Sequence, residues 1–273
     1  MTHRPHPAGA RRRPRRRRRG AAVWAFVACA VLLTAGIVGA FTLGGDDAGG
    51  SEPAGDTPPY RPEPEDPFPA KLEGPNTYPV ARISGRRLLY RRPGGEAKVR
   101  IADQTEWDTR RVLSVVDHRG EWLAVLVPEL KNGEVGWIRM SQVERLSAVT
   151  WSLHADVSKR ELEVRRDGKR VRKLRVGVGR PGHETPTGRF AVTDRLRVTD
   201  PASPYGCCVL ALTGHQTKLP PGWPGGDRLA VHATANLSNL GQAVSAGCMR
   251  SDPVEARWLI KNVPLGTPVF IRG

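Results

Sequence analysis

The most constraining feature of this sequence is a long apolar stretch near its start. Ala21–Leu43 has no ionisable side chain except the Cys29 thiol. About 20 helical residues cross the hydrocarbon core of a bilayer, so this stretch is long enough to span one. Residues 1–20 hold nine arginines and no acid. Because positive residues stay on the cytoplasmic side, we predict a cytoplasmic tail (1–20), a transmembrane helix (21–43) and an extracytoplasmic remainder.

Two other interpretations of the N-terminal region remain open. Val38-Gly39-Ala40 is a small-residue site of the kind at which signal peptides are cleaved, which would leave Phe41 as the new N-terminus. A polyarginine run could also bind nucleic acid, but its place directly before an apolar span argues against that. We therefore expect a retained membrane anchor and no nucleic-acid partner.

The charge distribution separates a linker from the folded part. The chain has 273 residues and a net charge of +16. Residues 44–79 are rich in proline, glycine and acids, which predicts a disordered linker that holds the folded part away from the membrane. Residues 80–273 are basic and long enough to form hydrophobic cores. Only four cysteines are present, which argues against a disulfide scaffold.

Residues 80–147 have the pattern of short strands joined by tight turns. Asn132-Gly133 is a hairpin signal that leads into a strand. We expect strands at Leu88–Tyr90, Val112–Val116, Trp122–Val127 and Val135–Ile138. With its Pro-Gly turn and its closing Asn-Gly…Gly-Trp-Ile hairpin, this segment resembles bacterial SH3-like domains. A ligand groove could use Trp107, Trp122 and Trp137, but we expect at least two of them to pack in the core.

Residues 148–273 are also predicted to be mostly strands, with one helix near the end. Asp252 can cap that helix, Pro253 suits its first position, and Glu255 would complete a capping box. The expected strands are Trp151–Asp156, Glu161–Arg166, Val171–Val178, Phe190–Asp194, Val209–Leu212, Leu229–His232 and Pro268–Arg272. The predicted fold class is mainly β with one or two short helices.

Two motifs for cofactors and metals are rejected. Gly177–Gly182 matches the G-x-G-x-x-G nucleotide fingerprint, but Pro181 and the turn-rich residues after it prevent the helix that this fingerprint needs. The histidines and cysteines lack the short ligand spacing of a zinc site. We therefore expect no cofactor and no metal. The adjacent Cys207 and Cys208 are expected to be buried thiols, with a local disulfide as the alternative.

His232 and Cys248 are the strongest candidates for chemistry. His232 ends an apolar strand, where a buried imidazole is costly unless it has partners. Cys248 follows Gly247 and precedes Arg250 and the predicted helix start, and a cation and a helix N-terminus lower the pKa of a thiol. An imidazole beside the thiol would complete a nucleophile–base pair. From spacing alone, a purely structural role for both residues is an equal alternative.

The combination of motifs in this segment resembles the L,D-transpeptidase catalytic domain, the YkuD-like family of cell-wall enzymes. Their hallmark is a histidine strand followed about sixteen residues later by Ser-x-Gly-Cys-x-Arg, here His232 and Ser245–Arg250. Thr185–Phe190, Pro204–Gly206 and Gly266–Val269 also agree. The resemblance covers nearly all of residues 150–273 and implies a β-sandwich catalytic domain.

The resemblance also implies roles for individual residues. Cys248 would be the nucleophile and His232 its general base. Gly247 and the Cys248 amide would stabilise the oxyanion, while Ser245, Arg250 and Tyr205 would shape the pocket. Two positions depart from the family: Ala246 stands where most members have histidine, and Ala233 where many have glycine or serine. If no side chain orients the imidazole, a backbone carbonyl must.

The implied activity is acyl transfer between peptidoglycan stem peptides. The enzyme would release the terminal D-alanine of one stem and join the acyl group to an amine of a neighbouring stem. An L,D-carboxypeptidase that passes the acyl group to water is an open alternative, as is a non-catalytic wall-binding protein. The expected partners are stem peptides, the membrane and, from the basic outer portion, anionic wall polymers.

Overall fold

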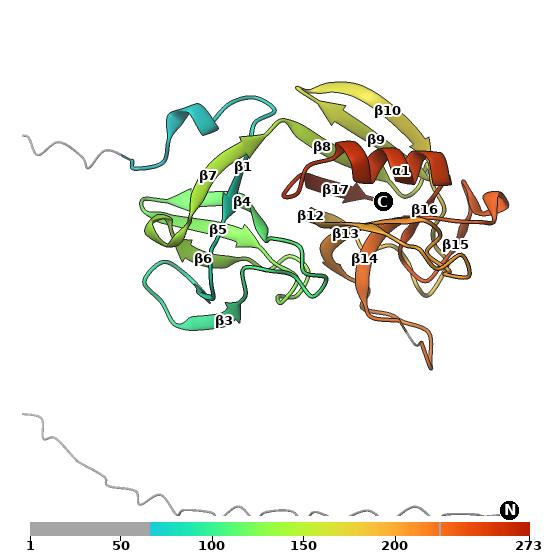
Figure 1. Cartoon of the computed structure of the whole chain (residues 1–273), viewed down its shortest axis with the longest axis horizontal. Helices are drawn as coiled ribbons and strands as arrows, with labels where there is room; N and C mark the ends of the chain where they lie inside the picture. Colours follow the sequence, from blue (N-terminus) through green and yellow to red (C-terminus); the bar gives the residue numbers. More distant parts are fainter. Residues whose placement is uncertain (1–65, 224) are drawn as a thin grey trace, which may run out of the picture. The chain divides into compact units, whose positions relative to one another are not determined.

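The computed structural model describes residues 66–223 and 225–273 (Figure 1). The predicted cytoplasmic tail, the transmembrane helix and most of the predicted linker lie outside these residues. Within the described part, no helix is both long and apolar enough to cross a membrane. The described residues form three sheets within one compact unit. We call the two parts of this unit the N-terminal lobe (66–149) and the C-terminal lobe (151–273).

The N-terminal lobe is a seven-stranded antiparallel sheet with two short 3-10 helices. Its strand order is β3-β2-β6-β5-β4-β1-β7. The elements are η1 (Ala70–Leu72), β1 (Tyr78–Arg82), β2 (Arg87–Tyr90), β3 (Ala97–Ile101), β4 (Val112–Arg119), β5 (Trp122–Leu126), β6 (Gly136–Arg139), η2 (Met140–Gln142) and β7 (Arg145–Val149). Every residue of the central strand β5 is buried.

The core of this lobe begins earlier in the chain than the sequence predicts. Phe68 and Leu72 lie in the stretch assigned to the linker, yet both are buried among the apolar residues of the sheet. The Phe68 ring stacks on His118 at a centroid distance of 4.1 Å. Two apolar side chains in a proline-rich stretch are too few to predict a core, but here the sheet provides the surface that buries them.

The tryptophans of this lobe divide as expected. Trp122 and Trp137 are buried in a small apolar cluster on the second face of the sheet, and Trp107 is exposed. The guanidinium groups of Arg139 and Arg119 lie over the rings of Trp122 and Trp137. The prediction that at least two tryptophans pack in the core is therefore confirmed.

The C-terminal lobe contains an eight-stranded sheet, a two-stranded sheet and one α-helix. The strand order of the large sheet is β10-β9-β8-β17-β12-β13-β14-β16, and β11 pairs with β15. The elements are β8 (Trp151–Asp156), β9 (Glu161–Arg166), β10 (Lys169–Arg175), β11 (Val178–Gly179), β12 (Gly188–Arg197), β13 (Cys208–His215), β14 (Arg228–Ala233), η3 (Leu237–Asn239), β15 (Ala243–Ser245), β16 (Met249–Ser251), α1 (Pro253–Asn262) and β17 (Pro268–Arg272).

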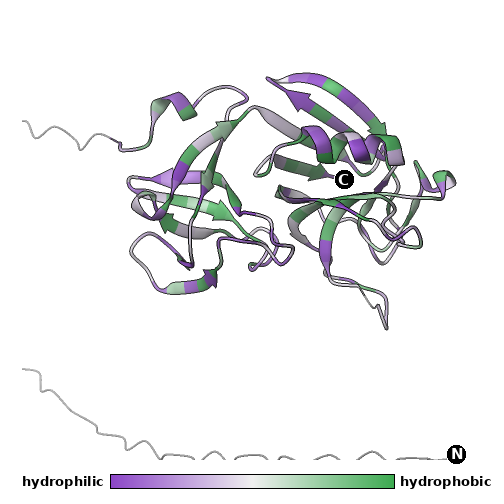
Figure 2. Cartoon of the chain, in the orientation of Figure 1, coloured by the Kyte–Doolittle hydropathy of each residue, from purple (hydrophilic) through white to green (hydrophobic). Residues whose placement is uncertain are grey.

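The long strand β12 joins the two halves of this sheet. Its residues Gly188–Ala191 pair with β17, and residues 192–197 pair with β13, with an irregularity between Val192 and Asp194. Leu153 and Leu162 from one half share a single apolar core with Leu210 from the other. Figure 2 shows apolar residues concentrated in these inner strands, while the edge strand β10 is mostly hydrophilic.

Helix α1 begins where the sequence predicts, but one of its predicted cap contacts is absent. The Asp252 carboxylate accepts a hydrogen bond from the Val254 amide at 2.7 Å, and Pro253 is the first helical residue. Glu255 does not complete a capping box. Its carboxylate instead pairs with Arg172 of β10, with both oxygens 2.7 Å from Nη1. An ion pair to a neighbouring strand replaces the local contact.

The prediction of a mainly β protein with one or two helices is confirmed at the level of fold class. Strands β8, β9 and β17 have the predicted bounds. The sequence missed β1, β3, β7, β15 and β16. These strands are short or rich in arginine and small residues, so neither alternation nor an apolar run marks them.

Candidate functional site

His232 and Cys248 come together because two short strands pair in parallel. His232 lies in β14, and β16 begins with Met249, directly after Cys248. In the register of this pair, Val231 is opposite Met249 and His232 is opposite Arg250. The thiol and the imidazole therefore reach the same end of the sheet from adjacent strands, and both side chains line one narrow cleft of about 60 Å³.

The lining of this cleft contains five of the six residues predicted from the sequence. Gly247, the sixth, lies in the turn just before the thiol. Besides His232 and Cys248, the cleft is lined by Pro204, Tyr205, Gln216, Leu219, Trp223, Gly226, Asp227, Arg228, Ser245, Ala246 and Arg250. Residues 204–205, 216–228 and 245–250 come from three separate segments, so only the fold brings them together.

The turn before Cys248 is closed by a serine hydroxyl. The Ser245 hydroxyl donates to the Cys248 carbonyl at 2.6 Å and accepts from the Gly247 amide at 3.0 Å. Gly247 has φ of +124°, and a Cβ there would lie 2.1 Å from the Gln216 side-chain nitrogen. Glycine is therefore required for both backbone conformation and space. Ser245 thus supports the turn from within, since its side chain is buried.

Two further side chains, which sequence reasoning did not assign to the site, hold the same turn from the other side. The buried Gln216 amide nitrogen lies 3.0 Å from the Ala246 carbonyl and 3.0 Å from the Glu184 carbonyl. The Thr185 hydroxyl donates to the Gly247 carbonyl at 2.8 Å. Thr185 was part of a recognised motif, whereas a single glutamine after a strand carries no sequence signal.

The hydrogen bonding of His232 determines which of its ring nitrogens is basic. Nδ1 lies 2.8 Å from the Ala233 carbonyl oxygen. A carbonyl can only accept, so Nδ1 carries the proton and Nε2 holds the lone pair in the neutral ring. The expectation that a backbone carbonyl orients the imidazole, because Ala233 has no polar side chain, agrees with this contact.

Burial keeps the imidazole neutral. His232 is 4% exposed, and this burial lowers its pKa to about 4 despite the opposing effect of the Ala233 and Tyr205 carbonyls. The Arg250 charge lowers the pKa further. At neutral pH the ring is therefore an uncharged base.

The Cys248 thiol is also neutral, which differs from the sequence expectation of an activated thiolate. Burial raises the pKa of the thiol to about 11, because it outweighs the lowering by a backbone contact at Ala230 and by the Arg250 charge. The thiol lies 3.7 Å from the Arg228 carbonyl, to which it donates. Within the described residues, no hydrogen bond joins the thiol to the imidazole. The resting pair is uncharged rather than an ion pair.

Tyr205 and Arg250 complete the walls of the cleft. The Tyr205 ring meets the His232 ring edge-on at a centroid distance of 5.1 Å. Burial and the neighbouring Cys248 raise the pKa of Tyr205, so its phenol stays protonated. The Arg250 backbone exchanges two hydrogen bonds of 2.8 Å with Gly177, which ties the strand after Cys248 to the glycine-rich loop.

The structure also places the residues considered for cofactors and metals. Gly177–Gly182 runs into turns without a helix, as predicted. In the described part of the chain, no three His, Cys, Asp or Glu side chains are grouped as metal ligands. Cys207 and Cys208 are free thiols. Cys208 is buried, which raises its pKa to about 12, whereas Cys207 is half-buried, so the expectation of two buried thiols is wrong for Cys207. His215 contacts Pro128 and Asn132 of the N-terminal lobe.

Comparison with known proteins agrees with the resemblance of the C-terminal lobe. Residues 151–271 match the family model YkuD, described as the L,D-transpeptidase catalytic domain. The chain is 32% identical over 96 residues to the YkuD protein of Bacillus subtilis, covering 35% of this chain and 50% of that protein. It is 26% identical over 147 residues to the YkuD protein of Bacillus licheniformis, covering 53% and 81%. An L,D-transpeptidase structure from Mycobacterium smegmatis gives a TM-score of 0.38 at 19% identity, covering 60% and 91%.

The chain thus spans half the length of the Bacillus subtilis relative that it matches. The match to the family model begins at the first strand of the C-terminal lobe and ends within its last strand. It includes His232, Cys248 and every other residue of the cleft, and it includes no residue of the N-terminal lobe.

The uncharged state of the pair predicts how Cys248 reacts with iodoacetamide. Because only the thiolate reacts and its pKa is about 11, the alkylation rate should rise about tenfold per pH unit between about pH 7 and pH 10. A rate constant at each pH from intact-mass measurements tests this, with Cys248→Ala as the control for the other thiols. A rate that is flat above about pH 7 would show a preformed thiolate and contradict this description of the site.

Proposed function

We propose that this chain is a peptidoglycan L,D-transpeptidase in which Cys248 is the nucleophile and His232 the general base. The observation that carries the proposal is the meeting of these two side chains in one cleft inside the segment that matches the L,D-transpeptidase catalytic domain. The substrate is a stem peptide of the cell wall, with the acyl group on the L-centre of its diamino acid.

In the first step, Cys248 attacks the carbonyl of the L,D peptide bond. Nε2 of His232 takes the thiol proton as the carbon–sulfur bond forms, because a neutral thiol needs a base during the attack. The C–N bond then breaks, and the D-alanine amine leaves with the proton from His232. The product is a thioester on Cys248, which keeps the free energy of the peptide bond without a metal or ATP.

In the described part of the chain, only one of the two backbone amides that the sequence suggested for the oxyanion is free to bind it. The Gly247 amide donates to the Ser245 hydroxyl, so it is occupied. The Cys248 amide has no hydrogen-bond acceptor within the described residues, and it lies next to the sulfur. We therefore assign the Cys248 amide to the oxyanion and the Ser245–Gly247 contact to the geometry of the turn.

In the second step, an amine of a neighbouring stem attacks the thioester and His232 accepts its proton. The amide forms and the thiol is restored, so atoms and charge balance over the cycle. If water replaces the amine, the same site acts as an L,D-carboxypeptidase. The same residues would serve an amine acceptor and a water acceptor. Transfer and hydrolysis are therefore distinguished by their products.

Cys248→Ala is expected to abolish both reactions, with a loss of at least about a thousandfold in rate, because the alanine lacks the attacking sulfur. His232→Gln should lower the rate by about 10²–10⁴, since the base is lost. Mass spectrometry of muropeptides incubated with and without an acceptor stem checks both variants and identifies the reaction. Cross-linked dimers indicate transfer, and trimmed tripeptides indicate hydrolysis.

A matched control is His215→Gln, which removes an imidazole that lies outside the cleft. If His215→Gln were the more damaging histidine variant, or if Cys248→Ala retained activity within a few-fold of the parent, the assignment of nucleophile and base would be wrong. Inactive parent protein with an intact fold would favour the third alternative, a wall-binding protein without catalysis.

The location that suits this activity is the outer face of the cell membrane. We propose that Ala21–Leu43 is a retained anchor, that residues 44 to about 65 are a spacer, and that the N-terminal lobe is an SH3-like domain. The arginines before the anchor and the acidic, proline-rich residues after it support this order. Such an arrangement keeps the cleft near a polymer that lies just outside the membrane.

A retained anchor makes the full-length protein a membrane protein. The mature chain should sediment with membranes until detergent is added, and its N-terminal sequence should begin before Ala21. An N-terminus at Phe41 together with release into the soluble fraction would instead show cleavage of a signal peptide.

A basic cavity on the C-terminal lobe supports an anionic wall polymer as a second partner. This cavity of about 680 Å³ is lined by the side chains of Arg195, Arg197, Arg257 and Lys261 and by no acidic residue. None of the four cations forms an ion pair with an acid of the described residues. Closely spaced positive charges without counter-charges attract a polyanion such as a phosphodiester polymer.

Neutralising three of these cations, in the variant Arg197→Gln/Arg257→Gln/Lys261→Gln, should weaken binding to poly(glycerol phosphate) by at least about tenfold at low salt, with less effect at high salt. A matched control, Arg86→Gln/Arg91→Gln/Arg100→Gln, removes the same charge from exposed positions of the N-terminal lobe. Equal losses in sedimentation or fluorescence binding assays for the two triple variants would show that net charge, rather than this cavity, attracts the polymer.

A further inference from the structure

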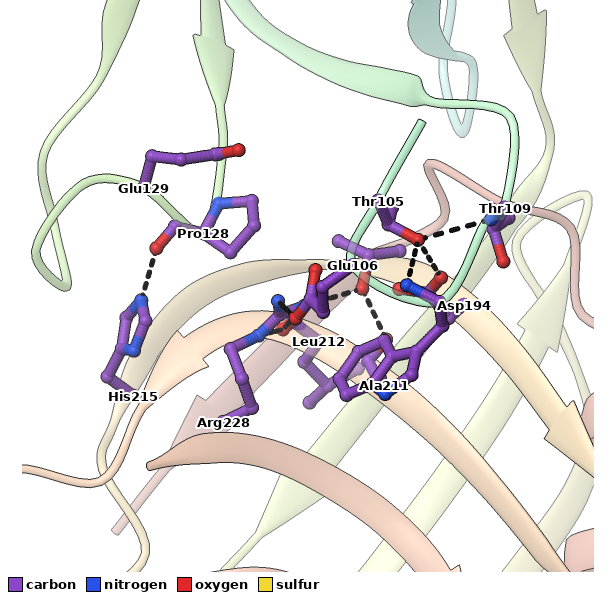
Figure 3. A network of polar contacts seen from close by, with 12 residues as sticks. Thr105, Glu106, Thr109, Pro128, Glu129, Asp194, Ala211, Leu212, His215 and Arg228 are labelled. Carbon is purple, nitrogen blue, oxygen red and sulfur yellow. Dashed lines mark hydrogen bonds and ion pairs between the residues drawn. The ribbon is translucent and has the colours of Figure 1, made fainter. Parts of the chain in front are cut away.

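One loop of the N-terminal lobe contacts the residue that holds the Cys248 thiol. The loop Thr105–Thr109 lies against Asp194 of β12 and against Arg228 at the start of β14 (Figure 3). The buried Thr105 hydroxyl donates to the buried Asp194 carboxylate at 2.5 Å. The same hydroxyl accepts from the Thr109 and Trp107 amides at 3.3 Å. The loop is therefore fixed both internally and to the second lobe.

Arg228 receives the side chains that this loop presents. Its guanidinium forms an ion pair with Glu106 and lies over the Trp107 ring, 5.1 Å from the centroid. Only 14% of the Arg228 side chain is exposed, against 45% for Glu106. An ion pair that is largely shielded from water on one side is held more firmly than an exposed pair.

The C-terminal lobe holds the other nitrogens of Arg228. Nε and Nη2 donate to the Leu212 carbonyl at 3.0 and 2.8 Å (Figure 3). Nη2 also lies 2.8 Å from the Thr193 hydroxyl. The planar guanidinium thus contacts β12, β13 and the N-terminal loop at once. A lysine has one charged nitrogen and cannot make this set of contacts.

The backbone of Arg228 then contacts the nucleophile. The Arg228 carbonyl accepts the hydrogen bond of the Cys248 thiol. If the Arg228 side chain lost its contacts and the residue moved, its carbonyl would move as well. The thiol points toward that carbonyl, so the sulfur would change direction. The charge of the Arg228 guanidinium does not contribute to the pKa shift of Cys248. Arg228 therefore acts on the sulfur through the position of its backbone carbonyl.

From these contacts we propose that Arg228 is a positioning residue for Cys248 and that Glu106 and Trp107 of the N-terminal lobe hold it in place. The N-terminal lobe is then part of the catalytic unit, in addition to any role in wall binding. This inference rests on the proposed function for its kinetic test, but the placement of the thiol can be measured without any transfer activity.

A second contact between the lobes supports the same assignment. Asn132 exchanges two hydrogen bonds with the His215 backbone, at 2.7 and 2.8 Å. The side chain of the next residue, Gln216, donates to the Ala246 carbonyl in the turn before Cys248. The backbone amide of Gln216 donates to the Asp227 carbonyl at 2.7 Å. Two separate loops of the N-terminal lobe therefore fix the two strand ends that hold the nucleophile.

The chain offers a closely matched control for the Glu106 contact. Glu121 pairs with Arg139, and the Arg139 guanidinium lies over the Trp122 ring at 4.7 Å. This pair has the same three residue types as Glu106, Arg228 and Trp107. Glu121, Arg139 and Trp122 all lie within the N-terminal lobe, and none of them lines the cleft. Glu106→Ala and Glu121→Ala thus remove the same kind of contact from two places, with the arginine 14% exposed in the first and 44% exposed in the second.

The test compares full-length parent, Glu106→Ala, Glu121→Ala, Arg228→Ala and Arg228→Lys in transfer kinetics and in the pH profile of Cys248 alkylation. Glu106→Ala should lower kcat about tenfold with KM within about twofold, because a displaced sulfur slows the chemistry without removing substrate contacts. It should also move the pH midpoint of alkylation to lower pH, because a displaced Arg228 carbonyl no longer accepts from the thiol and so no longer favours its neutral form. Arg228→Lys should restore only part of the rate lost in Arg228→Ala, and Glu121→Ala should change neither readout.

Equal effects of Glu106→Ala and Glu121→Ala, or a loss confined to KM, would overturn the proposal. If Arg228→Ala does not fold, the exposed Glu106 variant still decides the question. If the parent has no transfer activity, the proposed function fails. The alkylation midpoint then still tests the positioning, because a shift in Glu106→Ala alone supports it and an unchanged midpoint contradicts it.

Discussion

The turn Ser245–Cys248 is held by hydrogen bonds from three side chains, and the cleft depends on that turn. The Ser245 hydroxyl closes it from within, while Gln216 and Thr185 hold its carbonyls from outside. Gly247 lets Gln216 approach, since any Cβ would occupy the position of the amide. The sulfur therefore has a fixed position before any substrate arrives, and a site organised in advance loses little free energy to reorganisation during the reaction.

Burial then decides the protonation state of the pair. His232 is buried and Cys248 is half-buried, and the loss of water around each group favours its uncharged form. The Arg250 charge lowers both pKa values but does not overcome the effect of burial on the thiol. An uncharged thiol is a weak nucleophile, so the proposed mechanism needs proton transfer to His232 during the attack on the substrate carbonyl.

The sequence predicted the elements whose patterns are local. The strands β8 and β9 follow from apolar alternation, β17 follows from a short apolar run, and the start of α1 follows from Asp252 and Pro253. The pairing of His232 with Cys248 came from a motif at a fixed spacing. Features that depend on distant segments were missed, among them the contact of Gln216 with the turn and the ion pair that takes Glu255 away from the helix cap.

The state of the thiol was the expectation that differed most from the structure. A cation and a helix start lie close to Cys248 in sequence, and both lower a thiol pKa, but the extent of burial cannot be read from neighbouring residues. For the same reason, the burial of Phe68 and Leu72 in the core was hidden by the prolines around them. In each case the outcome depended on a surface formed by residues far away in the chain.

The most direct test of the central claim is to detect the thioester itself. Full-length protein mixed with a stem tetrapeptide in the absence of an acceptor should gain, by intact mass, the mass of one tripeptide acyl group minus the proton of the thiol. Peptide mapping should place that group on Cys248, and one D-alanine should be released per adduct. An adduct on Cys207 or Cys208, or D-alanine release that continues unchanged in Cys248→Ala, would contradict the account.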